Sequence, residues 1–182
     1  EGLFAGFDFT ILSATQLGLA EPEETENSFI GNAILKARAT ALSSGMAALG
    51  DDSGLSVAAL NGAPGVYSAR WAGPNRDFNI AMKAVEEAFL KTQSDDTRAE
   101  FICALALVWP DGHAVCVEGK TQGTLKFPAR GTRGFGYDPI FQPCGHNISF
   151  GEMDPNAKHA ISHRADAFAK LMSRCFIPYN NG

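Results

Sequence analysis

The residues FICALALVW at 101–109, the turn PDG at 110–112 and AVCVEG at 114–119 carry the clearest fold signal in this chain. The two flanking segments are rich in apolar, aromatic and β-branched residues, and Pro-Asp-Gly is typical of a tight turn. The pattern therefore predicts an antiparallel hairpin. A further strand is expected at 124–127.

Helical patterns lie on both sides of this hairpin. Apolar residues recur at helical spacing over 27–45, 77–91 and 162–175, and residues 7–14 have the composition of a β-strand. Helices and strands alternate early in the chain, whereas the hairpin comes late. We therefore expect an α/β fold with a mixed β-sheet flanked by helices.

Composition excludes several classes of protein. The 182 residues are 45% hydrophobic and carry a net charge of −5 without a dense block of Lys and Arg, which argues against binding to a nucleic-acid backbone. The apolar run at 101–109 is far shorter than the roughly 20 residues of a membrane span. The first residues do not form a signal peptide, so we expect a cytoplasmic protein that binds no nucleic acid and no membrane.

The tetrapeptide Asp51-Asp52-Ser53-Gly54 places two carboxylates after a short apolar run that is expected to form a buried strand. Ligands usually bind at strand ends in α/β sheets. Mg²⁺ favours one or two protein carboxylates together with phosphate oxygens. The alternative interpretation is a solvated turn in which Asp bonds its own backbone.

Two further segments have the composition of a nucleotide site. In the glycine-rich stretch 131–139, backbone amides can approach a phosphate or base closely, and Phe135 or Tyr137 can stack on a base. Ser162-His163-Arg164 places a capping residue and two donors at a helix start, where Lys158 can join them. Cations are disfavoured at that end of a helix, which favours an anionic or carbonyl ligand there. A plain surface loop and a plain surface helix are the alternatives.

Taken together, these segments resemble the inosine/xanthosine triphosphate pyrophosphatases. The resemblance covers nearly the whole chain in order and spacing. The matching motifs are Glu23-Glu24-Thr25, Asn32-Ala33, Leu35-Lys36-Ala37-Arg38, Asp51-Asp52-Ser53-Gly54-Leu55, Gly62 to Arg70, Gly134 to Phe141, Phe150 to Met153, Lys158 and Ile161-Ser162-His163-Arg164.

The resemblance implies an elongated, two-lobed α/β fold with a central cleft, usually in a homodimer. It implies hydrolysis of ITP, dITP or XTP to the monophosphate and pyrophosphate with Mg²⁺. Asp52 is implied as general base and metal-linked carboxylate, and Ser53 as a substrate contact. The implied nucleotide and base pocket consists of Phe135, Gly136, Tyr137, Asp138, Lys158, His163 and Arg164.

Two departures from the family pattern leave alternatives open. Residues 1–182 are expected to form a single domain that lacks the N-terminal strand and phosphate-binding loop of the family. The resemblance also implies a metal-binding Glu before Asn32, where this chain has Gly31. A purine nucleotide-binding protein with weakened or lost catalysis is therefore the second hypothesis. A pyrophosphatase for modified pyrimidines and an unrelated α/β binding module are the others.

Overall fold

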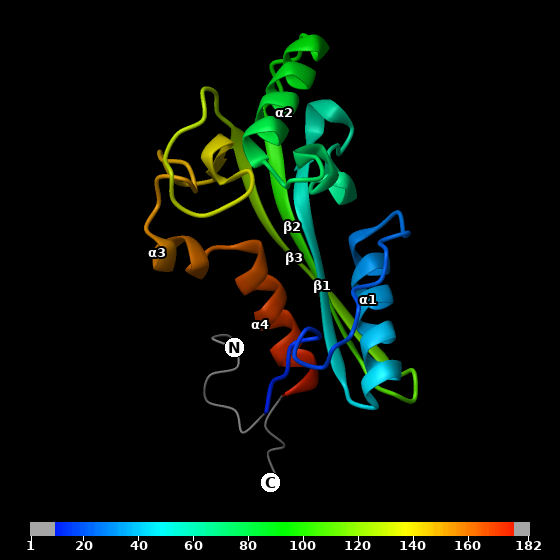
Figure 1. Cartoon of the computed structure of the whole chain (residues 1–182). Coiled ribbons are helices and arrows are strands. Elements are labelled where there is room, and N and C mark those ends of the chain that lie inside the picture. The colour runs from blue at the N-terminus through cyan, green and yellow to red at the C-terminus, as the bar shows by residue number, and fades with distance from the viewer. Residues whose placement is uncertain (1–9, 177–182) are drawn as a thin grey trace, which may run out of the picture. The chain divides into compact units, whose positions relative to one another are not determined.

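The computed structural model describes residues 10–176, and its element order is shown in Figure 1. Contacts within the chain divide it into two compact units. The first unit comprises Glu1–Asp52, Ala104–Val117 and Phe168–Gly182, and the second comprises Ser53–Cys103 and Glu118–Ala167. Helices and strands are both present, which confirms the expected α/β class.

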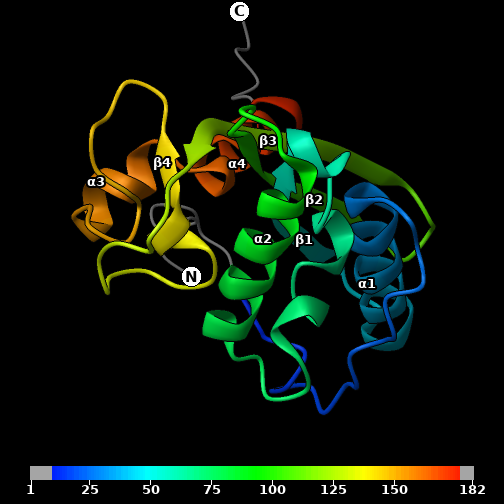
Figure 2. The same cartoon turned by 90° about the horizontal axis from the view of Figure 1, so that it is seen from above.

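The strands of the described residues form a four-stranded antiparallel sheet in the order β1-β2-β3-β4, where a mixed sheet was expected from the sequence. Their bounds are Ala48–Val57 for β1, Arg98–Val108 for β2, Ala114–Leu125 for β3 and Phe141–Pro143 for β4. The predicted hairpin is confirmed, since Trp109 N donates to His113 O at 2.9 Å across the turn between β2 and β3. Strand β4 pairs antiparallel with the end of β3, with Leu125 opposite Phe141 (Figure 2). Residues 124 and 125 of the further strand expected at 124–127 are thus the end of β3, and residues 126 and 127 lie beyond it.

Each predicted helix is present. The helices are α1 at Phe29–Ser44, α2 at Phe78–Thr92, α3 at Pro155–Ala160 and α4 at His163–Cys175. Short 3₁₀ helices cover Ala58–Leu60, Gly65–Tyr67, Arg70–Ala72 and Asp138–Ile140. Helix α1 begins after Ser28, whose side chain accepts from Gly31 N, and ends at Gly45 in a left-handed conformation. Within residues 10–176, no helix combines the length and the apolarity needed to cross a bilayer.

An aromatic cluster fills the core of the second unit. Phe101, Phe141 and Phe150 are buried against one another, with ring centroids 4.5 Å apart for Phe101 and Phe141. In the first unit, α1 lies close on β1 because Gly50 has no side chain. A Cβ at that position would meet the backbone of Ala33 and lie 2.8 Å from Ala37 N.

Two sequence predictions are corrected. The strand expected at 7–14 is wrong where the structure describes it: residues 10–13 are irregular and a turn follows from Ala14, while residues 7–9 lie outside the described part. Ser13 and Gln16 bond each other through side chains, and such local bonds compete with strand pairing. The tetrapeptide at 51–54 lies inside β1 rather than at the end of a strand.

Candidate functional site

Asp52 is held in place on β1 by a side chain from α1. Side chains alternate along a strand, so Asp51 is exposed whereas Asp52 is 7% exposed. Asn32 Nδ2 donates to Asp52 Oδ2 at 3.0 Å, and Asn32 Oδ1 accepts from Glu26 N at 3.0 Å. The buried amide therefore connects the carboxylate to the acidic loop before α1 and fixes its orientation.

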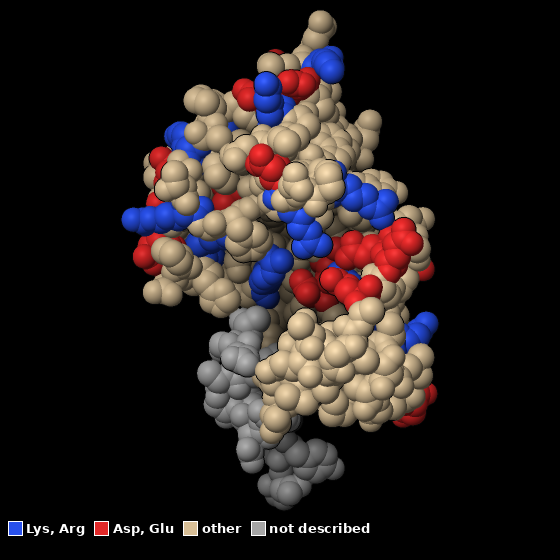
Figure 3. Space-filling model, viewed as in Figure 1, with Lys and Arg blue, Asp and Glu red and all other residues tan. Residues whose placement is uncertain are grey.

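A lysine lies among carboxylates in the same unit. Lys36 Nζ donates to Glu24 Oε1 at 2.6 Å. Burial alone would lower the pKa of Lys36, but Glu24, Asp52 and Asp51 raise it above its ordinary value. Figure 3 shows Asp and Glu side chains gathered on the viewed face around the start of α1.

The donor chemistry of this acidic region fits a hard cation that arrives with phosphate. Asp52, Asp51 and Glu24 offer carboxylate oxygens, which Mg²⁺ prefers. Within residues 10–176, no group of three or more His, Cys, Asp or Glu forms a complete metal cage. A cation would therefore take one or two carboxylates here and its remaining ligands from a substrate or water.

Gly31 is covered by its own loop. A Cβ at this position would lie 2.8 Å from Glu26 Cβ and 2.9 Å from Ser28 Oγ. A carboxylate introduced at residue 31 would therefore have to displace Glu26, whose backbone orients Asn32.

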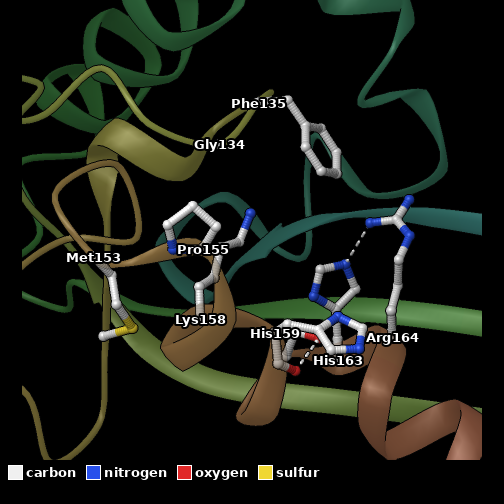
Figure 4. Close-up of a pocket in the computed structure, with 9 residues that line it drawn as sticks. Gly134, Phe135, Met153, Pro155, Lys158, His159, His163 and Arg164 are labelled. Carbon is white, nitrogen blue, oxygen red and sulfur yellow. Dashed lines mark hydrogen bonds between the residues drawn. The ribbon is translucent and has the colours of Figure 1, made fainter. Parts of the chain in front are cut away.

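Two hollows in the second unit share the residues Phe135, His163 and Arg164. One, of about 240 Å³, is bordered by Gly134 and by α3, and Figure 4 shows Lys158 and His163 pointing into this region. The other, of about 150 Å³, is lined by Ser53, Phe101 and Tyr137 among others. The structure thus brings together Ser53, Phe135, Gly136, Tyr137, Asp138, Lys158, His163 and Arg164, all eight of which were predicted from the sequence.

A buried ion pair supports this pocket from within. Asp138, 2% exposed, accepts from Lys158 Nζ and, at 2.7 Å, from Phe135 N. Gly134 has a positive φ of 78°, and a Cβ there would meet the Asp138 carboxylate. The Asp138 carboxylate therefore holds both the glycine-rich loop and the lysine.

Arg164 fixes the tautomer of His163. Arg164 Nη1 lies 3.1 Å from His163 Nε2, and because a guanidinium can only donate, Nε2 must be the accepting nitrogen. Burial, together with the charges of Arg164 and Lys158, lowers the pKa of His163 to about 3, so the ring is neutral and carries its proton on Nδ1. Within the described residues, no acceptor bonds this buried Nδ1.

The remaining pocket residues play different parts. Phe135 is 63% exposed, with Lys158 Nζ 4.6 Å and the Arg164 guanidinium carbon 5.2 Å from its ring centroid. The hydroxyl of Tyr137 donates to Ser68 O at 2.8 Å, and burial raises its pKa. Tyr137 therefore holds a neighbouring loop. The Oγ of Ser53 is buried, and no described residue bonds it.

Sequence reasoning missed two residues of these sites. Phe101 lines the smaller hollow and stacks on His163, but in the sequence it is one apolar residue of a strand. Asn32 was noted within a motif but not as the partner of Asp52. A polar residue among the apolar positions of α1 was the signal that could have identified it.

The fold and the two sites define an α/β protein with a hydrogen-bonded carboxylate and a pocket of aromatic and cationic side chains. Residues 2–174 match the model of the Ham1 family, and the chain belongs to that family.

Named relatives and solved structures agree with this membership. The dITP/XTP pyrophosphatase of Caulobacter vibrioides is 64% identical over 92% of this chain and 87% of its own length. That of Rhodospirillum centenum is 63% identical over 90% of this chain and 81% of its own length. A Ham1 protein from Coxiella burnetii superposes with a TM-score of 0.91 at 38% identity, covering 95% of this chain and 89% of that one.

Proposed function

We propose that this protein hydrolyses deaminated purine nucleoside triphosphates, namely ITP, dITP and XTP, to the monophosphate and pyrophosphate. The names of the relatives support this activity. The observation that carries the choice of base is the buried Nδ1–H of His163, which lacks an acceptor within the described residues.

The donors in the pocket suit a 6-oxo purine. Lys158 and Arg164 can only donate, and the tautomer of His163 makes its Nδ1 a donor as well. A 6-oxo group accepts hydrogen bonds, whereas the 6-amino group of adenine would face these donors as a further donor. A site that leaves buried donors unpaired discriminates strongly against the wrong ligand. Guanine also carries a 6-oxo group, so this feature separates 6-oxo from 6-amino purines.

We assign general-base catalysis to Asp52. Its carboxylate is oriented by Asn32, as a group that accepts a proton from attacking water must be. Ser53 follows it directly in β1 and is assigned to contact the substrate. Asp52, with Asp51 or Glu24, would hold a Mg²⁺ ion, which when bound neutralises phosphate charge.

Product analysis on the native protein tests the proposal. With Mg²⁺, ITP and XTP should yield the monophosphate and pyrophosphate in equal amounts, ATP should react far more slowly, and a chelator should stop the reaction. Release of orthophosphate and a diphosphate, or equal rates with ITP and ATP, would overturn it.

The surroundings of Gly31 favour a second candidate, a purine nucleotide-binding protein with weakened catalysis. Glycine supplies no carboxylate that could bind a cation at this position, and Glu26 fills the space that a side chain would need. Tight binding of ITP without release of pyrophosphate would identify this case. From the resemblance we also infer a cytoplasmic homodimer, and light scattering at micromolar concentration tests the dimer.

A further inference from the structure

Phe101 of β2 lies against the imidazole of His163. The two ring centroids are 4.9 Å apart and the ring planes differ by 14°, so the rings are stacked. Phe101 is itself 6% exposed and packs on Phe141 and Phe150. The imidazole therefore rests on a ring that is fixed by the aromatic core.

This contact bears on the two properties of His163 that base selection requires. The ring must stay oriented so that Nε2 meets Arg164, because a rotation by half a turn would exchange nitrogen and carbon positions and break that bond. It must also stay neutral, and removal from water is the largest cause of its lowered pKa. A flat apolar ring against one face of the imidazole restricts its rotation and shields it from water.

The charged groups around His163 do not replace this contact. Arg164 from α4 and Lys158 from α3 face the imidazole, and Lys158 is paired with Asp138 from the 3₁₀ helix Asp138–Ile140. Both cations disfavour a charged imidazole, whereas the stacked apolar ring is that of Phe101.

We propose that Phe101 is a positioning residue for base selection: its stacked ring holds His163 in the orientation and the Nδ1–H tautomer that offer a donor to a 6-oxo purine. The inference deepens the proposed function and rests on it for the identity of the base. Phe101 makes no hydrogen bond with the base in this account and acts through His163.

The test combines NMR with kinetics on the variants Phe101→Leu and Phe101→Met, which keep an apolar side chain without a flat ring. The histidine ring nitrogens are followed by ¹⁵N NMR from pH 8 to pH 5, with His163 assigned from a His163→Asn spectrum. In the native protein His163 should remain the neutral Nδ1–H tautomer throughout. In the variants it should become protonated within this range or show both tautomers, and the ratio of kcat/KM for ITP to that for ATP should fall about tenfold, the loss of one good hydrogen bond.

Phe89→Leu is the matched control, because Phe89 packs against the same hydrophobic core and its ring lies against Phe127. It should lower stability while preserving the His163 tautomer and the substrate ratio. An unchanged His163 spectrum in both Phe101 variants would overturn the proposal, as would equal shifts in Phe89→Leu. The NMR result needs no substrate, so it decides the role of Phe101 even if the native protein fails to hydrolyse ITP.

Discussion

The acidic region of the first unit and the aromatic and cationic pocket of the second differ in how they hold their charged groups. Around Asp52, an amide and a partly exposed lysine contact carboxylates near the surface. In the pocket, one buried carboxylate, Asp138, holds a lysine beneath an aromatic ring. The first arrangement gathers several carboxylates around one amide and one lysine, whereas the second pairs a single buried carboxylate with a lysine.

The largest expected effect is at Asp52. Asp52→Asn keeps the size of the side chain but removes the proton acceptor, so kcat for ITP should fall about 100- to 10,000-fold, the usual contribution of a general base. The matched control is Asp95→Asn, since Asp95 is an exposed carboxylate in the connection between α2 and β2 and belongs to neither site. Comparable rates in Asp52→Asn and native protein, measured as pyrophosphate release, would remove Asp52 from the chemistry.

The next largest effect is expected when the buried ion pair of the pocket is broken, and breaking the ion pair of the acidic region should cost less stability. Asp138→Asn leaves Lys158 charged and buried, which should lower the free energy of unfolding by about 3 kcal/mol. Glu24→Gln breaks the Lys36 pair, whose side chains are 15% and 30% exposed, and should cost about 1 kcal/mol or less. Urea unfolding of both variants checks this order. Equal losses in the free energy of unfolding would show that the two ion pairs are equally important for stability, contrary to this comparison.

In both regions, the residues within motifs could be predicted from the sequence, whereas their distant contact partners could not. Asp52, Ser53 and the pocket residues lie in short motifs that resemble those of the pyrophosphatase family, and their roles were predicted from that resemblance. The partners Asn32 and Phe101 lie 20 and 62 residues away from the groups they contact, Asp52 and His163, so only the fold brings them together.

The fold shows the same division. The hairpin and the helices α1, α2 and α4 follow from hydrophobic period, turn and cap residues and were predicted from the sequence, whereas the short helix α3 was not. The strand expected at 7–14 failed over 10–14 because strand formation depends on a pairing partner, which composition does not reveal. The cleft expected between two lobes stays a prediction.

Acidification should lower the stability of the protein through the buried His163. Its pKa is lowered from 6.5 to about 3 in the folded protein, so below pH 6.5 the unfolded chain takes up a proton that the folded protein does not. The free energy of unfolding should therefore decrease as pH falls, approaching a slope of about 1.4 kcal/mol per pH unit from this group near pH 5. His163→Asn should lose that part of the slope.

Exposed His159 provides the control for this titration. His159→Asn should retain the native slope between pH 6.5 and pH 5. If both substitutions change the slope equally, His163 is not the buried neutral group described above.

The smallest effect is expected at Gly31. Alanine favours a helix over glycine by up to about 1 kcal/mol, yet its Cβ would press on Glu26 and Ser28. Gly31→Ala should therefore give no gain in stability, and Gly31→Glu should not raise the rate of pyrophosphate release. A clear gain in melting temperature for Gly31→Ala would contradict this and show that Glu26 and Ser28 move aside at little cost.

The most direct test of base selection by the donor pocket is the ratio of kcat/KM for ITP to that for ATP, measured with Mg²⁺ on the native protein and on Arg164→Ala. Removing Arg164 takes away one donor and the group that fixes the His163 tautomer. The ratio should be far above one in the native protein and should fall at least tenfold in the variant, mainly through a loss of rate with ITP. Equal losses with both substrates would contradict the account.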